Sequence, residues 1–258
     1  MNILDTIVEH KRMEVLLRKQ KRPLSNLATF PNYRRKVNPI LLPGEGKAGF
    51  IAEFKRRSPS KGALNMTADP KEVAAKYQAA GVSVMSVLTD RKFFGGSFRD
   101  LADVREACPK LPLLRKDFFI DPYQIHEASA YGADMILLIA AILEKQEMAD
   151  LAGEAEALGM HVLLEVHNET ELEKYVPSIS FVGVNNRDLK TFQVDTGRSM
   201  ELIGKMPEGV IPVSESGISS PGEISLLYDA GYKLFLMGER FMKQSDPGEA
   251  CRSFIEKL

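Results

Sequence analysis

Five short apolar runs of this chain each end at residues whose side chains can transfer protons or bind anions. The runs are IAEFK (51–55), LLRKD (113–117), LLEVH (163–167), VGVNNRD (182–188) and VSES (213–216). A buried parallel strand reads as a continuous apolar run, and in α/β sheets ligands bind outside the carboxyl ends of such strands. The placement therefore predicts one functional site that several strands build together.

The first run places a carboxylate and an ammonium group on the same side of a strand. Glu53 and Lys55 are two residues apart, so their side chains point the same way, together with Ile51. Burying both charges inside a sheet is costly unless they are paired. They form either a structural ion pair or part of the site, and the polar loop that begins at Ser58 favours the site.

A second lysine and a second glutamate are expected to meet at the same end of the sheet. Lys116 follows the third strand and Glu165 lies in the fifth. Burial and neighbouring charges shift the pKa of such groups, which fits both for proton transfer near neutral pH. Lys116 is alternatively a Schiff-base lysine, as in barrel aldolases. Either role requires a substrate with a carbonyl group.

Asn185 and Arg187 follow the sixth strand. An asparagine side chain offers both a donor and an acceptor, which suits it to orient a hydroxyl or a carbonyl. Arg187 either clamps an anion or pairs with Asp188 or another acid. Three phenylalanines follow the second and third strands and predict either an aromatic wall for a ring-bearing substrate or ordinary packing: Phe93, Phe94 and Phe118.

The ends of the seventh and eighth strands predict a phosphate site. Ser216 and Gly217 end one run, and Gly238 and Glu239 end the other, so that small residues expose backbone N–H groups. A short helix over 240–243 would aim its positive end at an anion. Loops after strands seven and eight of a barrel frequently bind phosphate. The carboxylate of Glu239 is an unfavourable neighbour for phosphate, so only its backbone is expected to face the ligand.

A repeated pattern positions these side chains. The segments QAAGVSVMSVL, SAYGADMILLI, EALGMHVLLEV and YDAGYKLFLMG each join a helix-like tail to an apolar strand through a glycine that can adopt positive φ, and these glycines are Gly81, Gly132, Gly159 and Gly231. Strands are predicted over 50–54, 84–88, 112–115, 135–139, 161–166, 181–184, 211–213 and 233–237. Helices are predicted over 70–79, 122–131, 145–158, 169–175, 221–230 and 246–257.

Eight such units fit an α/β fold of one (β/α)8 TIM barrel, whose usual size is about 250 residues. A doubly wound open sheet is the alternative, but no dinucleotide-type glycine fingerprint follows the first strand. Residues 1–258 are therefore expected to form a single TIM-barrel domain. Residues 1–45 lie outside the repeat and predict a helical extension packed on the barrel. Its basic residues form either a binding stripe or, as the charge spacing favours, a solvated face: Arg12, Arg18, Lys19, Lys21 and Arg22.

Composition excludes several classes of function. The 258 residues carry a formal net charge of -1, so no basic field attracts nucleic acid or anionic lipid. The two cysteines show no CxxC spacing and favour a reducing, cytoplasmic compartment. The four histidines show no ligand pattern, so no metal is expected. No run is long enough to cross a membrane. The residues thus predict proton transfer on a carbonyl-bearing phosphosugar, without metal or other cofactor.

The motifs IAEFKRRSPSKG, LLRKDFFID, LLEVHN, GVNNRDL, SESGI and LMGE resemble those of the indole-3-glycerol-phosphate synthase family of tryptophan biosynthesis. The N-terminal ILDTIVEHKRMEV resembles that family's extra helix, and the likeness covers nearly the whole chain. It implies a carbon–carbon lyase (a carboxy-lyase). The family closes the indole ring of 1-(2-carboxyphenylamino)-1-deoxyribulose 5-phosphate, which yields indole-3-glycerol phosphate, carbon dioxide and water.

The resemblance also implies a role for each matching residue. Lys116 would be the general acid at the ribulose carbonyl oxygen, and Lys55 would hold the substrate carboxylate and be available as a later proton donor. Glu165 would be the general base or an electrostatic stabiliser, with Glu53 as its partner. The other implied roles are orientation of hydroxyls and lysines by Asn185 and Glu215, completion of the polar ring by Ser58 and Ser216, and phosphate binding by Ser216, Gly217, Gly238 and the Glu239 amide.

The sequence also allows other hypotheses of function. One is another phosphosugar barrel, such as a phosphoribosylanthranilate isomerase, but no cysteine ends a strand here. A Schiff-base aldolase and a non-catalytic phosphate-binding barrel are the others, and the second would be expected to lose part of the acid–base set. Glu239 departs from the small or hydroxyl residue common at the family's phosphate loop. The expected assembly is a monomer or a weak homodimer.

Overall fold

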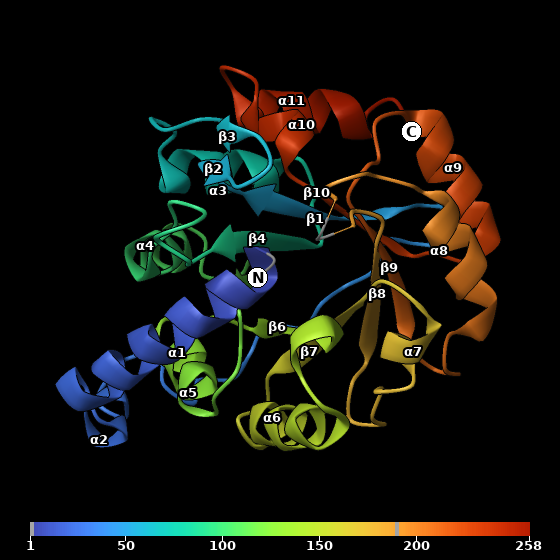
Figure 1. Cartoon of the computed structure of the whole chain (residues 1–258). Helices are drawn as coiled ribbons and strands as arrows, with labels where there is room; N and C mark the ends of the chain where they lie inside the picture. Colours follow the sequence, from blue (N-terminus) through green and yellow to red (C-terminus); the bar gives the residue numbers. More distant parts are fainter. Residues whose placement is uncertain (1–2, 189–190) are drawn as a thin grey trace.

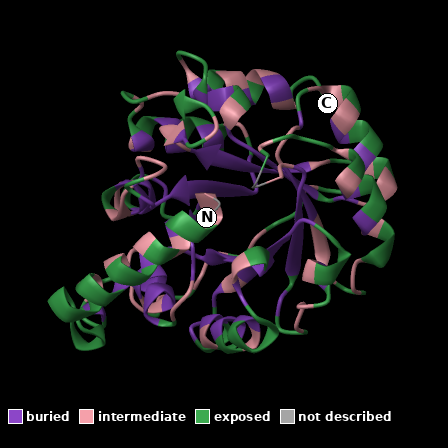
Figure 2. Ribbon diagram, in the orientation of Figure 1, coloured by how far each residue is buried: buried purple, intermediate pink, exposed green. Residues whose placement is uncertain are grey.

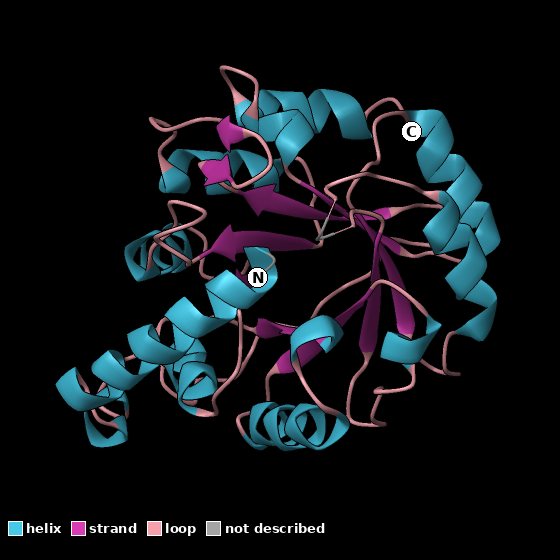
Figure 3. Cartoon of the chain, viewed as in Figure 1, coloured by secondary structure: helices cyan, strands magenta, loops and turns pink. Residues whose placement is uncertain are grey.

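The computed structural model describes residues 3–188 and 191–258 of the chain. Eight parallel strands close into a barrel, and helices surround it (Figure 1, Figure 3). The barrel strands are β1 (Gly49–Phe54), β4 (Val84–Leu88), β5 (Leu113–Lys116), β6 (Met135–Ile139), β7 (His161–Val166), β8 (Phe181–Asn185), β9 (Ile211–Glu215) and β10 (Leu234–Met237). Each pairs with the next along the chain, and β10 closes on β1. The predicted TIM barrel is therefore confirmed.

The remaining elements lie outside the barrel sheet. The α-helices are α1 (Ile3–Lys21), α2 (Leu24–Leu27), α3 (Pro70–Ala79), α4 (Phe98–Ala107), α5 (Tyr123–Ala130), α6 (Lys145–Ala157), α7 (Glu169–Leu172), α8 (Gly197–Leu202), α9 (Pro221–Ala230), α10 (Glu239–Met242) and α11 (Pro247–Ile255). Two 3₁₀ helices, η1 (Ala140–Ile142) and η2 (Ile203–Lys205), and a small hairpin, β2 (Arg57–Ser58) with β3 (Gly62–Ala63), complete the fold. No helix within residues 3–188 and 191–258 has the length and apolar character needed to cross a membrane.

The predicted strand bounds agree with the structure to within two residues, and the differences matter at the carboxyl ends. Strands β5, β8 and β9 each extend further than predicted. Lys116, Asn185 and Glu215 are therefore the last residues of strands and do not lie in the loops that follow. Their backbones are held by the ladder, which makes the positions of these three side chains more rigid than loop residues would be.

Local sequence explains how the helices begin and end. The side chains of Asp69, Ser220 and Asp246 accept hydrogen bonds from the first free backbone N–H groups of α3, α9 and α11. Each of these helices also has a proline in its first turn. All four linking glycines of the repeat have positive φ, as predicted. The chain thus turns sharply from helix to strand in each unit.

Alternation along each strand separates two apolar cores. Ile51 points into the barrel, where it packs with Leu114, Leu163 and other inward residues. Ala52 and Phe54 point outward and pack between the sheet and the helices. The barrel strands are mostly buried, whereas the outer faces of the helices are largely exposed (Figure 2). The predicted inward direction of Ile51 is confirmed, and Glu53, two residues later, lies on the same side.

The N-terminal helix α1 begins over the centre of the barrel and runs outward past α5 (Figure 1). Its buried residues are Ile7, Lys11 and Val15, a spacing of one helical turn. Leu16, next to Val15, is 49% exposed. The predicted solvated face is confirmed for four exposed residues, Arg12, Lys19, Lys21 and Arg22. It is wrong for Arg18, which is partly buried and pairs with Glu127 of α5 at 2.9 Å.

A buried ion cluster holds the amino ends of β5 and β6. Asp134 is fully buried and accepts hydrogen bonds from Arg105, from Arg35 and from the backbone N–H of Leu113. Arg105 also donates to the carbonyl oxygens of Gly132 and Leu111, at 2.8 and 2.9 Å. Burial lowers the pKa of Arg105 to about 10 although Asp134 opposes the shift. This cluster fixes the end of the barrel opposite to the strand ends that carry Lys116 and Glu165.

Replacing Asp134 with alanine is expected to lower the free energy of unfolding by about 3–5 kcal/mol, because Arg105 would keep a buried charge without its partner. Urea denaturation of the purified variant measures this change. The matched control is Lys205→Ala, which removes an exposed ion pair with Glu169 and is expected to leave the denaturation midpoint nearly unchanged. Equal midpoints for wild type and Asp134→Ala would contradict the assignment.

Candidate active site

A cavity of about 1060 Å³ lies at the carboxyl ends of the barrel strands. The residues that line it belong to the carboxyl ends of the strands, to the loops that follow them and to the first turns of α1. Most of the site residues predicted from sequence line it: Glu53, Lys55, Ser58, Phe94, Lys116, Phe118, Glu165, Asn185, Arg187, Ser216, Gly217, Gly238 and Glu239. The strand ends therefore converge on one space, as predicted.

Lys116 stands among three buried carboxylates. Its Nζ lies 3.2 Å from Glu215 Oε2, 3.4 Å from Glu53 Oε2 and 4.0 Å from Glu165 Oε2. The carboxylates come from β9, β1 and β7, so the closed sheet brings them together from strands far apart in the chain. Burial acts to lower the pKa of Lys116, but the three carboxylates outweigh it and raise the pKa above its ordinary value. Lys116 thus carries a proton at neutral pH.

Glu53 joins the two lysines of the site. One of its carboxylate oxygens accepts a hydrogen bond from Lys55 and the other faces Lys116. Burial favours the neutral acid, yet the charges of Lys55 and Lys116 prevail and lower the pKa of Glu53 to about 2. Gly238 packs directly against this carboxylate, because a Cβ there would lie 2.6 Å from Glu53 Oε1. The absence of a side chain at Gly238 therefore leaves room for the carboxylate of Glu53.

Glu215 lies beneath Lys116 and does not line the cavity. It is fully buried, and its Oε1 has no hydrogen-bond partner among the described residues. Burial raises the pKa of Glu215 to about 7, with a further contribution from Glu165, while Lys116 acts in the opposite direction. Glu215 is thus placed to orient Lys116, whereas direct contact with a substrate hydroxyl would require it to leave that position.

The loops after β8, β9 and β10 form the polar end of the cavity. Ser216 and Gly217 both have positive φ, 64° and 81°, in a tight turn that directly follows β9. The side chain of Asn186 donates to the carbonyl oxygen of Ser216 at 3.1 Å and so supports this turn. Gly238 caps α10. Four basic side chains line the cavity around these loops: Lys61, Arg187, Arg240 and Lys243.

The carboxylate of Glu239 is held by cations at this polar end. Arg187 Nη2 lies 3.3 Å from Glu239 Oε2, and Lys243 donates to Glu239 Oε1. Partial burial tends to raise the pKa of Glu239, but Lys243 and Arg187 lower it. Of the two alternatives for Arg187, the structure shows pairing with an acid, and that acid is Glu239. Asp188 instead lies 3.5 Å from Arg198.

Aromatic and aliphatic side chains form the opposite end of the cavity. The rings of Phe94 and Phe118 lie with their centroids 5.9 Å apart, and both line the cavity. Phe93, predicted as part of this wall, does not line the cavity and packs edge-on against His10 of α1. The apolar end is completed by residues that were expected only to pack on the barrel: Ile3, Leu4 and Ile7 of α1.

His167 ends one of the five apolar runs, but the sequence predicted no role for it in the site. Its Nδ1 lies 3.0 Å from Glu171, and its Nε2 lies 3.8 Å from Oε1 of Glu165. Burial tends to lower the pKa of His167, but the two carboxylates raise it. Its position two residues after Glu165 was the available signal, since residues two apart on a strand share a side. Among the described side chains, no group of His, Cys, Asp and Glu is arranged to hold a metal ion.

Comparison with known proteins relates the chain to one family. Residues 4–254 match the family model described as indole-3-glycerol phosphate synthase. A protein of that name from Bacteroides thetaiotaomicron is 44% identical over 260 residues, which cover 100% of this chain and 99% of the relative. One from Chromobacterium violaceum is also 44% identical, over 255 residues and 96% of each chain.

Two solved structures of low sequence identity share the fold. A crystal structure of 3-hexulose-6-phosphate synthase superposes with a TM-score of 0.65 at 16% identity, and it covers 81% of this chain and 99% of its own. A KGPDC structure from Streptococcus mutans gives 0.61 at 14% identity, with coverage of 82% and 99%. At such low identity the likeness concerns the fold.

Replacing Glu215 with glutamine tests its raised pKa. The folded carboxyl titrates near pH 7 and the unfolded one near its ordinary 4.5, so the folded state binds more protons between these values. The contribution of Glu215 to stability therefore falls as the pH rises from about 4.5 to 7. Glutamine stays neutral, so the Glu215→Gln variant should gain stability relative to wild type between pH 5 and pH 8, by on the order of 2–3 kcal/mol.

Urea denaturation at four pH values across this range measures the difference in the free energy of unfolding. Glu208→Gln, at an exposed position, is the matched control and should give a curve parallel to that of wild type. A Glu215→Gln curve that is also parallel to wild type would show that the carboxyl of Glu215 ionises in its ordinary range.

Proposed function

This chain belongs to the indole-3-glycerol phosphate synthase family, and we propose that the residues at its barrel mouth carry out the ring closure of 1-(2-carboxyphenylamino)-1-deoxyribulose 5-phosphate. The products are indole-3-glycerol phosphate, carbon dioxide and water, which makes the protein a carboxy-lyase of tryptophan biosynthesis. One observation carries the proposed roles: Lys116 stands among three carboxylates in a cavity with an aromatic end and a cationic end.

In the proposed first step the ring carbon that bears the carboxylate attacks the ribulose carbonyl carbon. Lys116 gives its proton to the carbonyl oxygen, which becomes a hydroxyl as the new carbon–carbon bond forms. The carboxylate then leaves as carbon dioxide, and its bonding electrons restore the aromatic ring. Glu53, Glu165 and Glu215 stabilise the ammonium form of Lys116 before the reaction, so the acid is in place when substrate binds.

The second part of the proposed reaction is the loss of water. The hydroxyl leaves with a proton from Lys55, and Glu165 takes the proton that the five-membered ring loses. Both side chains line the cavity. Glu53, which hydrogen-bonds Lys55, keeps that ammonium group near the place of the substrate carboxylate before decarboxylation. Asn185, also on the lining, orients the substrate hydroxyls.

The protonation state of Lys116 favours a general acid over a Schiff-base nucleophile. An imine forms only from a neutral amine. The carboxylates around Lys116 raise its pKa although burial opposes them, so the neutral amine is rare at physiological pH. This is the observation that separates the proposed chemistry from that of a barrel aldolase.

The two ends of the cavity suit the two ends of the substrate. The phosphate is proposed to lie at the backbone of Ser216, Gly217, Gly238 and Glu239, beside the cations at that end. The carboxyphenyl ring is proposed to lie against the rings of Phe94 and Phe118 at the apolar end. Arg187 is proposed to turn to the substrate when phosphate competes with Glu239 for cations. Ser58, buried at the rim, completes the polar wall.

We further propose that the protein works in the cytoplasm, as a monomer or a weak homodimer, on this small phosphosugar and without nucleic acid. The two cysteines, Cys108 and Cys251, are buried and unpaired, which suits a reducing compartment. The near-zero formal net charge suits a small-molecule substrate recognised by local cations and not by a global field.

Turnover of the purified protein tests the proposed function. Indole-3-glycerol phosphate should form from the carboxyphenylamino-deoxyribulose phosphate, which its fluorescence reports, and Lys116→Met should lower kcat by at least about a thousandfold because it removes the proton donor. Lys205→Met, at an exposed position, is the matched control. Near-normal turnover by a folded Lys116→Met variant would contradict the proposed role of Lys116 as the general acid. Absence of turnover by the wild-type protein would contradict the proposed function.

The Glu165→Gln variant tests whether Glu165 acts in catalysis or in substrate binding. The amide keeps the size of the side chain but cannot accept a proton, so kcat should fall by about 10²–10⁴-fold while KM changes little. Steady-state kinetics of the variant measures both constants. A raised KM with an unchanged kcat would make Glu165 a binding residue.

A further inference from the structure

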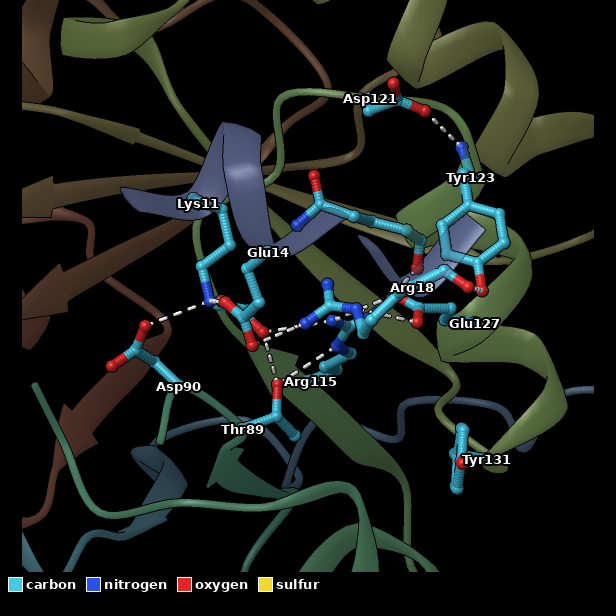
Figure 4. Close-up of polar contacts among 12 residues, drawn as sticks. Lys11, Glu14, Arg18, Thr89, Asp90, Arg115, Asp121, Tyr123, Glu127 and Tyr131 are labelled. Atoms are coloured by element: carbon cyan, nitrogen blue, oxygen red, sulfur yellow. Dashed lines mark hydrogen bonds and ion pairs between the residues drawn. The ribbon is translucent and has the colours of Figure 1, made fainter. Parts of the chain in front are cut away.

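Lys11 of α1 is a buried cation outside the acid–base cluster. Its ammonium group is fully buried and lies 2.8 Å from Asp117 Oδ1, 2.9 Å from Asp90 Oδ2 and 2.6 Å from Glu14 Oε2. Figure 4 shows the side chain reaching from α1 toward Asp90, with Glu14 beside it. Burial disfavours the charge, but these carboxylates outweigh it and raise the pKa of Lys11. An apolar side chain of similar volume would often stabilise the fold as well as a buried charge does. The buried ammonium group therefore points to a role beyond packing.

The first partner of Lys11 controls the loop that follows β4. Asp90 Oδ2 faces Lys11, and its other oxygen accepts hydrogen bonds from the backbone N–H groups of Phe93 and Phe94, at 2.7 and 3.3 Å. Phe93 in turn packs on His10 of α1, whereas Phe94 lines the cavity. The Asp90 carboxylate therefore holds the backbone from which the ring of Phe94 projects.

The second partner controls the segment that follows β5. Asp117 directly follows Lys116, and its Oδ1 accepts a hydrogen bond from the backbone N–H of Phe118 at 2.9 Å. Its Oδ2 accepts from Thr89 at 2.6 Å and from the buried Arg115 at 2.9 Å (Figure 4 labels both donors). Asp117 is therefore held by Thr89 and Arg115 of the barrel and by Lys11 of the N-terminal helix.

We propose that Lys11 is a positioning residue that sets the separation of the Phe94 and Phe118 rings, and so the fit of the carboxyphenyl ring above Lys116. One ammonium group connects both loops, which belong to neighbouring strands, to a helix whose own residues Ile3, Leu4 and Ile7 close the same end of the cavity. The N-terminal helix is thereby part of the substrate site. The inference rests on the proposed function, because it assigns the ring of that substrate to this end.

The test compares Lys11→Met with wild type in the full-length protein. Methionine keeps the length and the apolar stem but removes the charge that joins the two loops. We expect kcat/KM to fall by on the order of 10–100-fold, as a misplacement of about 1 Å can cause. We expect weaker binding of 2-aminobenzoate, which represents the ring end, and unchanged binding of glycerol 3-phosphate, which represents the phosphate end.

Two further variants keep the test decisive. Glu14→Gln removes a partner of Lys11 that touches neither loop, so its kcat/KM should stay within about twofold of wild type. Asp90→Asn keeps the acceptor for Phe93 and Phe94 but weakens the pairing with Lys11; it should show the same selective loss as Lys11→Met, and it decides the question if Lys11→Met does not fold.

A folded Lys11→Met variant with wild-type kcat/KM overturns the proposal. So does an equal loss of both ligands, which would mean a general loosening of the fold. Absence of turnover in wild type would overturn the proposed function instead, and selective loss of 2-aminobenzoate binding would still report the positioning role. Selective weakening at the ring end, with glycerol 3-phosphate unaffected, is the result that supports it.

Discussion

The placement of a protonated lysine among three buried carboxylates is the constraint on which the rest of the mouth of this barrel depends. A buried carboxylate or ammonium group costs several kcal/mol unless partners compensate it, and here the partners of Lys116 come from three different strands. Only a closed sheet brings those strand ends to one point. Gly183 and Gly238 leave the room that the carboxylates need, because a Cβ at either would come within 2.6 Å of a glutamate oxygen.

The same cluster divides the glutamates by environment. Glu53 faces two lysines and has a pKa of about 2, whereas Glu215 lies deeper, shares one lysine with other acids and has a pKa of about 7. The surroundings of two side chains of one chemical type thus shift their pKa values in opposite directions. Glu53 stays negatively charged between its two lysines.

Charge and apolar surface are arranged in a gradient along the cavity. Basic side chains line the cavity near the loops after β8 and β10, and the rings of Phe94 and Phe118 line it at the loops after β4 and β5. Glu239 does not disturb the cationic end, because Arg187 and Lys243 pair with its carboxylate. The helix α1, whose first turn covers the apolar end, adds a surface that the eight repeated units do not supply.

The barrel, the approximate strand bounds and the acid–base residues of the site could be predicted from the sequence, because these follow from local rules. Alternation along β1 places Glu53 and Lys55 on the inward side, and glycines with positive φ end the helices before the strands. Parallel strands in a closed sheet then bring their carboxyl ends together whatever the details of packing.

The pairing of side chains that are remote in sequence could not be predicted and is visible only in the folded chain. Glu215 lies beneath Lys116 and outside the cavity wall, Arg187 pairs with Glu239, and Phe93 turns to His10. Lys11 looks like an ordinary charge of an amphipathic helix, yet it is buried against Asp90 and Asp117. The physical reason is that the direction of a strand residue follows from its own backbone, whereas the partner of a long charged side chain depends on where another helix or loop docks.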